Sequence, residues 1–164
     1  MAAVLPSAGT DDDLIAAAGQ GDERAFDVLV GRHVDTAFRL AVTMLRDRPE
    51  AEDAVQEATL KAWRAIGRLR PGSNVRGWFL TIVANHCRSQ LRSRWWSVLR
   101  LPDTDRVAAA GAEDVAVNRT DLARALQRLS PDDRLAVYLR YYEDMSIEDV
   151  AAVTGTSVPA ARSG

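Results

Sequence analysis

The chain has 164 residues, of which 47% are apolar, and its 21 Lys and Arg against 23 Asp and Glu give a net charge of -2. This composition excludes a disordered polyelectrolyte. The length allows one domain or, as we expect, two small ones. The single Cys87 excludes an internal disulfide, and His33 and His86 are too few and too far apart for a metal cluster, so neither a metal nor another cofactor is expected. No apolar run approaches the roughly 18 to 20 residues of a membrane span and no export signal begins the chain, so we expect a cytoplasmic protein without membrane insertion.

Helical patterns dominate the first part of the chain. Thr10, followed by three aspartates, is typical of an N-cap with acids in the first turn, where they oppose the positive end of the helix dipole. From Phe26 to Leu45 the apolar residues recur at steps of three and four, which predicts a second helical segment with one buried stripe. Pro49 suits the first turn of the next helix, which is expected to end near Gly67.

The helix that begins near Pro49 has two different faces. One face is apolar and is predicted to be buried, whereas Asp53, Gln56 and Glu57 share the opposite face. An isolated acidic stripe of this kind is usually a solvated surface. A docking surface for another protein is the alternative. It is supported only by the order of the elements that follow along the chain.

Charge is distributed unevenly along the chain. Residues 1–59 hold 12 acids and 5 bases, residues 60–100 hold 9 bases and no acid, and residues 101–164 hold 11 acids and 7 bases. The middle segment also contains all four tryptophans. Because cations hold phosphates and aromatic rings stack on bases, this segment is a candidate nucleic-acid surface. A solvated basic face with tryptophans in the core is the alternative.

Two elements are predicted inside the basic segment. Residues 68–74 combine Arg, Pro, Gly, Ser and Asn, which indicates a loop rich in hydrogen-bonding groups. Apolar residues at helical spacing predict that the next helix buries Trp78, Phe79, Ile82, Val83, Cys87 and Leu91. A polar stripe of the same helix consists of Thr81, Asn85, Arg88 and Arg92.

The last part of the chain predicts a linker followed by short helices. From about Ser97 the pattern fades into scattered aspartates and a run of alanines, which is typical of an interdomain linker. Ser130 and Ser146 each precede acids in the way that an N-cap does. The helix after Ser146 ends near Gly155 and another begins at once, which is typical of a helix-turn-helix. No segment alternates with period two, so an all-α fold is expected.

Several stretches of sequence resemble one known family. Residues 53–63, DAVQEATLKAW, resemble region 2.2 of bacterial RNA polymerase sigma factors of the extracytoplasmic function (ECF) group, in the sigma-70 family. Residues 74–89 resemble regions 2.3 and 2.4 of these proteins. The motifs at residues 129–134, 141–151 and 155–158 resemble region 4. The match runs in the family's order from about Asp12 to Ser163.

The resemblance implies both an architecture and a function. Two small helical domains are expected, a sigma region 2 bundle at residues 10–96 and a region 4 helix-turn-helix at residues 119–164, joined by a linker at residues 97–118. The implied function is that of a non-enzymatic RNA polymerase subunit, which directs transcription initiation by recognising and melting promoters. Its implied partners are core RNA polymerase and promoter DNA, with an anti-sigma factor as a further candidate.

The resemblance also gives roles to particular residues. In this family the region 2.2 helix docks on core polymerase, which fits the polar face of Asp53, Gln56 and Glu57. The following loop and helix open the minus-ten element and hold a flipped base. The candidates for that pocket are Arg70, Ser73, Asn74 and Asn85. The candidates for holding the DNA backbone are Arg76, Arg88, Arg92 and Arg94. The candidates for the minus-thirty-five element are Thr156, Ser157 and Arg162.

The chain departs from the family pattern at its C-terminal end. Family members continue beyond the position of Ser163 with a basic recognition helix, whereas this sequence stops at Gly164. About two turns of that helix can form, and Arg162 is its sole cation. We therefore expect a truncated recognition helix, either because the chain has lost the contact with the minus-thirty-five element or because the sequence is part of a longer chain.

Two other functions are alternatives to that of a sigma factor. A free-standing helix-turn-helix regulator would bind duplex operators without polymerase, and it would need a dimerisation surface and a complete recognition helix. An enzyme acting on nucleic acid would need carboxylates in the basic segment, which contains none. Since the acidic and basic parts of the chain have opposite charges, the free protein is expected to bind promoter DNA poorly, unlike an operator-binding regulator.

Overall fold

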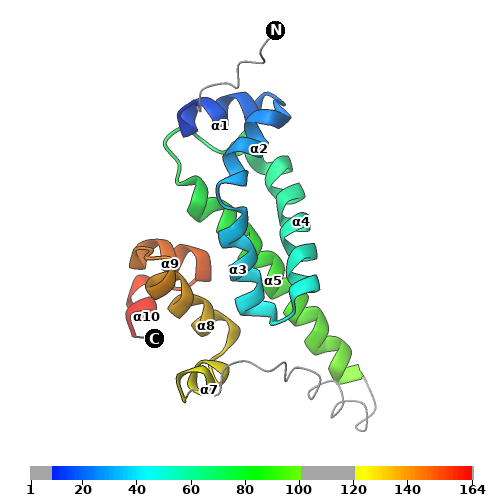
Figure 1. Ribbon diagram of the computed structural model, residues 1–164, viewed down its shortest axis with the longest axis vertical. Coiled ribbons are helices and arrows are strands. Elements are labelled where there is room, and N and C mark those ends of the chain that lie inside the picture. The colour runs from blue at the N-terminus through cyan, green and yellow to red at the C-terminus, as the bar shows by residue number, and fades with distance from the viewer. Residues whose placement is uncertain (1–8, 101–120, 164) are drawn as a thin grey trace.

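The computed structural model describes residues 9–100 and 121–163, and within these ranges every regular element is a helix. The all-α fold predicted from the sequence is therefore confirmed (Figure 1). In chain order the elements are α1 (Asp11–Gly19), α2 (Glu23–Gly31), α3 (Val34–Leu45), α4 (Arg48–Ala65), the 3₁₀ helix η1 (Ile66–Arg68), α5 (Val75–Arg100), α7 (Asp121–Gln127), α8 (Pro131–Val137), the π-helix η2 (Tyr138–Tyr142), α9 (Ile147–Thr154) and α10 (Val158–Ser163).

Side-chain caps begin the helices where the sequence predicts them. At the start of α1 the Thr10 hydroxyl accepts a hydrogen bond from the backbone N of Asp13, and the Asp13 carboxylate accepts one from the backbone N of Thr10. This reciprocal pair is a capping box. Ser130 and Ser146 cap α8 and α9, each accepting a hydrogen bond of 3.1 Å from the backbone N three residues later. These local predictions are confirmed.

The segment from Phe26 to Leu45, predicted as one helical stretch, forms two helices. α2 ends at Gly31, and α3 begins at Val34 after a turn through Arg32 and His33. Glycine is a poor helix former, which favours a break at this point. With the partly buried Val34 between Val30 and Ala37, the apolar residues keep their steps of three and four across the turn, so the periodicity did not reveal it.

The N-terminal unit, α1 to α5, encloses a well-packed core. α3, α4 and α5 run side by side, and α1 and α2 cover one end of them (Figure 1). Phe79, Val83 and Cys87 of α5 are fully buried, as predicted, together with Leu40 of α3. The other residues of the predicted stripe are only partly buried, namely Trp78, Ile82 and Leu91. Leu80 and Ala84, which the predicted stripe did not include, are fully buried, so the buried stripe of α5 is turned around the helix axis relative to the prediction.

The C-terminal unit, α7 to α10, contains the predicted helix-turn-helix. α9 ends at Gly155, which adopts the left-handed conformation with φ 69°, and α10 follows at Val158. Glycine suits this position because it has no Cβ to clash in that region of backbone space. The helical segment that Ser130 begins is divided into α8 and the π-helix η2.

The two units contact each other through α8 and α9. In Figure 1 these helices lie beside α3 and α5, far from α4. The buried residues of the C-terminal unit join the same continuous cluster as the core of the N-terminal unit; they are Leu135, Leu139, Met145, Val150 and Val153. The sequence contained no sign of this contact.

The helix α5 is longer than predicted. The expected linker began at Ser97, but α5 continues through Arg100, and residues 101–118 of that linker lie outside the described residues. The extra turn places Trp95 and Trp96 near the end of a long helix, where their side chains are exposed. In the described ranges, no helix is both long and apolar enough to cross a membrane.

Two histidines predict a loss of stability in mild acid. Burial lowers the pKa of His33 below 6.5, helped by the charge of Arg76, and burial with the charge of Lys61 lowers the pKa of His86. A lowered folded-state pKa contributes stability that is present above 6.5 and is lost as the pH falls from there through the folded-state pKa. The free energy of unfolding, measured with urea, should therefore decrease between about pH 7 and pH 5. A double His33→Gln, His86→Gln variant should show a shallower decrease, and an equal slope would contradict the assignment.

Candidate nucleic-acid interface

The polar face of α4 lies open to solvent, as predicted. Asp53, Gln56 and Glu57 are all exposed. The helix starts at an Asp47 cap, whose carboxylate accepts a hydrogen bond of 2.8 Å from the backbone N of Glu50. Its opposite face is buried and consists mainly of alanine, with Ala51, Ala54, Val55, Ala58 and Ala62. Because small residues allow close packing on α3 and α5, the polar face is presented by a firmly held helix.

The loop before α5 is held by two polar contacts. The Asn74 side-chain oxygen accepts a hydrogen bond of 3.0 Å from the backbone N of Gly77, and so caps α5. The backbone N of Gly72 donates a bond of 2.6 Å to the Asp12 carboxylate of α1. Sequence reasoning missed Asp12, because nothing local links it to a glycine 60 residues away. In this loop Arg70 is exposed and Ser73 is half-buried.

The polar stripe of α5 brings Asn85 and Arg88 together. The Arg88 Nη1 donates a hydrogen bond of 2.6 Å to the Asn85 side-chain oxygen. The Arg88 Nε donates to the Asp132 carboxylate of α8 at 2.8 Å, and Nη2 donates to the backbone O of Val153 at 2.7 Å. Arg88 is therefore held by the C-terminal unit. Asn85 is exposed and keeps its amide NH₂ group as a donor.

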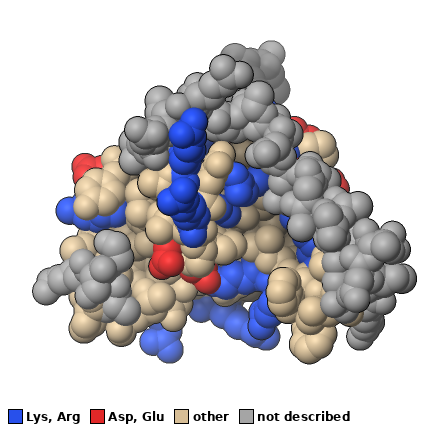
Figure 2. Space-filling view, turned by 90° about the horizontal axis from the view of Figure 1, so that it is seen from below, with Lys and Arg blue, Asp and Glu red and all other residues tan. Residues whose placement is uncertain are grey.

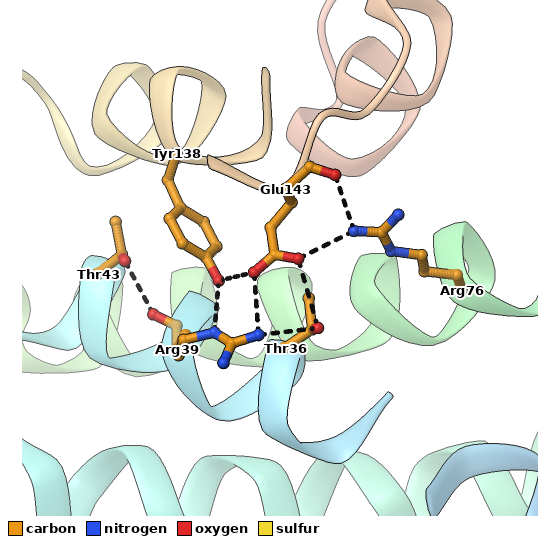
Figure 3. A network of polar contacts seen from close by, with 6 residues as sticks. All are labelled: Thr36, Arg39, Thr43, Arg76, Tyr138 and Glu143. Carbon is orange, nitrogen blue, oxygen red and sulfur yellow. Dashed lines mark hydrogen bonds and ion pairs between the residues drawn. The ribbon is translucent and has the colours of Figure 1, made fainter. Parts of the chain in front are cut away.

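The remaining residues proposed for the minus-ten element contact the C-terminal unit, contact α4 or are exposed to solvent. The Arg76 guanidinium contacts the Glu143 carboxylate (Figure 3), and the Asn74 amide donates to Asp149 at 3.2 Å. Arg94, near the end of α5, forms an ion pair with Glu50 of α4. Arg92 is exposed. The structure thus places all eight candidates on one loop and one helix, but acidic side chains from elsewhere already contact Asn74, Arg76, Arg88 and Arg94.

Basic side chains gather at the end of the molecule where α5 and α7 lie. Figure 2, which views that end, shows many Lys and Arg side chains and few Asp and Glu among the described residues. Exposed Arg92 belongs to this last part of α5, and Trp95 and Trp96 are 62% and 59% exposed beside it. Cations next to exposed aromatic rings suit a nucleic acid, whose phosphates and bases they can hold together.

The candidates for the minus-thirty-five element lie around the turn into α10. Thr156 is exposed, and its hydroxyl lies 2.9 Å from that of Thr154. The backbone O of Ser157 accepts a hydrogen bond of 3.0 Å from Ala161 and so begins α10. The side chain of Arg162 lies outside the described residues. The turn therefore presents a hydroxyl-rich surface.

The single cysteine and the groups that could bind a metal were the remaining candidates for chemistry among the described residues. Burial raises the pKa of the Cys87 thiol to about 12, so that thiol stays protonated and unreactive at neutral pH. Among the residues with described positions, no group of three His, Cys, Asp or Glu side chains is arranged to hold a metal ion. Cys87 is a core residue, as its place on the apolar stripe predicted.

Family models match the two units separately. The model of sigma-70 region 2 matches residues 29–97, and that of sigma-70 region 4 matches residues 119–163. RNA polymerase sigma-H factor of Pseudomonas aeruginosa is 33% identical over 93% of this chain and 86% of that protein. RNA polymerase sigma factor CarQ of Myxococcus xanthus is 36% identical over 87% and 83%. ECF RNA polymerase sigma factor SigM of Mycobacterium tuberculosis is 35% identical over 90% and 75%.

Solved structures show the same fold. The sigma factor RpoE from Bartonella quintana, solved in complex with the anti-sigma factor NepR, gives a TM-score of 0.71 with 30% identity, covering 85% of this chain and 89% of that one. CnrH, solved in complex with the cytosolic domain of CnrY, gives a TM-score of 0.66 with 27% identity, covering 93% and 88%. Both matches extend over the two helical units of this chain.

Proposed function

The chain belongs to the sigma-70 family of RNA polymerase sigma factors, in the ECF group, and on that premise we propose that it docks on core polymerase through α4 and opens promoters with the loop at residues 69–74 and α5. Promoter recognition for transcription initiation is the function of this family, and the resemblance predicted from the sequence is confirmed. The chain is proposed to be non-catalytic and to act in the cytoplasm, where polymerase and DNA are found.

The arrangement of α4 and α5 carries this proposal. α4 presents Asp53, Gln56 and Glu57 on a face that the bundle leaves exposed, and the adjacent α5 belongs to a segment without any carboxylate. A polymerase bound to the first face would bring DNA to the second. Region 2 is proposed to comprise residues 10–96 and region 4 residues 119–164, with residues 97–118 as the connection.

The minus-ten residues are proposed to act in two ways. Arg70, Ser73, Asn74 and Asn85 would line a pocket for a flipped base, since their donors and acceptors can match a base edge. The cations Arg76, Arg88, Arg92 and Arg94 would hold the backbone and add affinity without sequence choice. Of this set Arg70, Asn74, Asn85 and Arg92 are exposed in the described structure. The minus-thirty-five element is proposed to meet Thr156, Ser157 and Arg162.

An anti-sigma factor is proposed as a further partner. The two similar solved structures are of sigma factors in complex, RpoE with the anti-sigma factor NepR and CnrH with the cytosolic domain of CnrY. The basic end of α5, with its exposed tryptophans, offers a surface that an acidic protein could cover.

Run-off transcription with core polymerase and a library of promoters tests the proposed function. The chain should start transcripts from a subset of promoters that core polymerase alone does not use. Tight, sequence-specific binding of duplex promoter by the chain without polymerase would instead favour the operator-binding regulator.

Charge reversal on α4 tests the polymerase-binding face. The double variant Asp53→Lys, Glu57→Lys should weaken core binding by about tenfold or more, because like charges replace complementary ones at a docking surface. The matched control reverses Asp27 and Asp35, which are also exposed but lie on α2 and α3. Titration of labelled core polymerase measures both variants. Equal affinities for wild type and the α4 variant would refute the assignment of this face.

A further inference from the structure

The acidic start of α1 contacts the loop that we assign to the base pocket. The Asp12 carboxylate accepts a hydrogen bond of 2.6 Å from the backbone N of Gly72, 60 residues further along the chain. α1 packs against η1, and in Figure 1 the connection from η1 to α5 passes beside α1. A hydrogen bond to a charged acceptor is stronger than one between neutral groups. Asp12 therefore lies where it can influence the shape of this loop.

The loop contains a tight turn whose type follows from its residues. The backbone N of Ser73 donates to the backbone O of Arg70 at 3.2 Å, which closes a four-residue β-turn. Pro71 is the second residue, where its ring fixes φ at a negative value, and Gly72 is the third, with φ 82°. Among the standard turns, type II combines a negative φ with a positive one in this order. Residues 70–73 therefore form a type II turn.

The central peptide unit of such a turn has two orientations. Types I and II differ in the orientation of the peptide between the second and third residues, which is turned over in one relative to the other. The bond that closes the turn does not use the Gly72 N–H, so it holds neither orientation. Apart from its chain neighbours, no described atom lies within 4 Å of where a Cβ of Gly72 would be, so crowding holds neither. The bond to Asp12 does, because it requires the N–H to face α1.

The orientation of this peptide determines which group the turn presents to a base. In a planar trans peptide the N–H and the C=O point in opposite directions. Because the Gly72 N–H points toward α1, the Pro71 carbonyl points away from α1, on the side from which a base can approach. With the peptide turned over, an N–H would be presented there instead. A donor and an acceptor match different base edges, so the orientation affects base selectivity.

α1 is held firmly enough to anchor the loop. Its residues Ile15 and Ala18 are buried in the core, and the capping box fixes its first turn. Asp11 adds an ion pair of 2.6 Å to Arg32 of α2. The Asp12 carboxylate is therefore presented to the loop from a fixed stretch of backbone.

We propose that Asp12 is a positioning residue for promoter recognition, which holds the turn at residues 70–73 in the conformation that selects a base of the minus-ten element. Asp12 acts through Gly72 and does not itself contact the base. The inference rests on the proposed function, since it requires that the loop at residues 69–74 meets the flipped base. Without the bond, the selective conformation is populated only part of the time, and the apparent affinity for the preferred base falls by that fraction.

Two substitutions of Asp12 and one of its neighbour test this role. Asp12→Ala removes both the acceptor and the charge, whereas Asp12→Asn removes the charge and keeps a side-chain oxygen that can accept the bond. Asp11→Ala is the matched control, because it removes the same charge from a side chain that contacts Arg32 instead of the loop. Each variant is assembled with core polymerase, and the holoenzymes are titrated with fork-junction DNAs that carry single-base changes in the minus-ten element.

Base selectivity separates positioning from a merely structural role. Asp12→Ala should lower the affinity for the preferred minus-ten sequence about fivefold, the factor that one net hydrogen bond contributes, and should leave the affinity for the changed sequences within about twofold. Asp12→Asn and Asp11→Ala should keep the selectivity of wild type. The affinity for core polymerase, which is assigned to α4, should be the same in all three variants.

Hydrogen exchange of the Gly72 amide, followed by NMR, measures the contact directly in the free chain. The amide should exchange about fivefold faster in Asp12→Ala than in wild type, because it has lost its acceptor. Asp12→Asn and Asp11→Ala should exchange at nearly the rate of wild type. The same rate in Asp12→Ala as in wild type would overturn the contact and the proposal with it.

Other results would also overturn the proposal. Wild-type selectivity in Asp12→Ala would mean that the loop does not need the bond. An equal change for every sequence, or an equal loss of selectivity in Asp12→Asn, would assign the effect to charge, and a weaker affinity for core polymerase would assign it to structure. Failure of the proposed function is distinct, because wild-type holoenzyme would then start no transcripts or show no preference among minus-ten bases.

Discussion

Replacing Phe79 by alanine is expected to lower the free energy of unfolding by about 3–5 kcal/mol, the usual cost of truncating a buried phenylalanine. Phe79 is fully buried on α5, where α3 and α4 pack against the same helix. The loss combines the apolar surface that is no longer buried with the cavity that remains. Since a domain of this size has roughly 5–15 kcal/mol in total, the variant should be marginally folded.

Urea denaturation followed by circular dichroism measures this change. The matched control is Trp95→Ala, which truncates a larger aromatic ring on the same helix at a position that is 62% exposed. That variant should stay within about 0.5 kcal/mol of wild type, as surface substitutions generally do. A similar loss in both variants would mean that helix formation by α5, rather than burial of Phe79, sets the stability.

Substitution at Asn85 and Arg92 is expected to separate base recognition from phosphate binding in α5. Both residues are exposed, but they differ in chemistry, since an amide offers a donor and an acceptor whereas a guanidinium offers only donors. Asn85→Ala should lower affinity by about 1–3 kcal/mol, mainly for the preferred minus-ten sequence. Arg92→Ala should weaken binding for every sequence and reduce the salt slope by about one unit.

Binding of holoenzyme to fork-junction DNAs with single-base changes, at several salt concentrations, measures both effects. Ser89→Ala is the control, because Ser89 is exposed one turn after Asn85 on the same helix. Asn85 also accepts a hydrogen bond from Arg88, so its replacement frees that guanidinium from one partner. If Asn85→Ala and Arg92→Ala lower affinity equally for every base, Asn85 does not belong to the base pocket.

Local signals in the sequence determined where most helices begin and which faces they bury. Thr10, Ser130 and Ser146 each cap a helix through a bond to a backbone N three residues later, and Gly155 ends α9 in a conformation that favours glycine. These features depend on residues within one turn, so a single stretch of sequence contains everything needed to predict them. The same holds for the exposed face of α4.

The spacing of apolar residues located the core, but it did not show where one helix ends and the next begins. The turn at His33 separates α2 from α3 without changing the steps between apolar residues, because partly buried Val34 continues the spacing, so the sequence predicts one segment where two exist. Periodicity reports which side of a helix is buried, whereas the path of the axis depends on the partner it packs against. In α5, the packing against neighbouring helices also determined which side chains are buried. Trp78 and Leu91 remain partly exposed at the edge of the apolar stripe.

Only the tertiary structure decided what the basic residues contact. The sequence located Arg76 and Arg88 in an acid-free segment, yet they meet Glu143 and Asp132, which lie 67 and 44 residues further along the chain. Such pairs have no local signal, because the chain between them does not fix their separation in space. They form because α8 and α9 bury apolar side chains against α3 and α5, and that packing brings the two charges within reach.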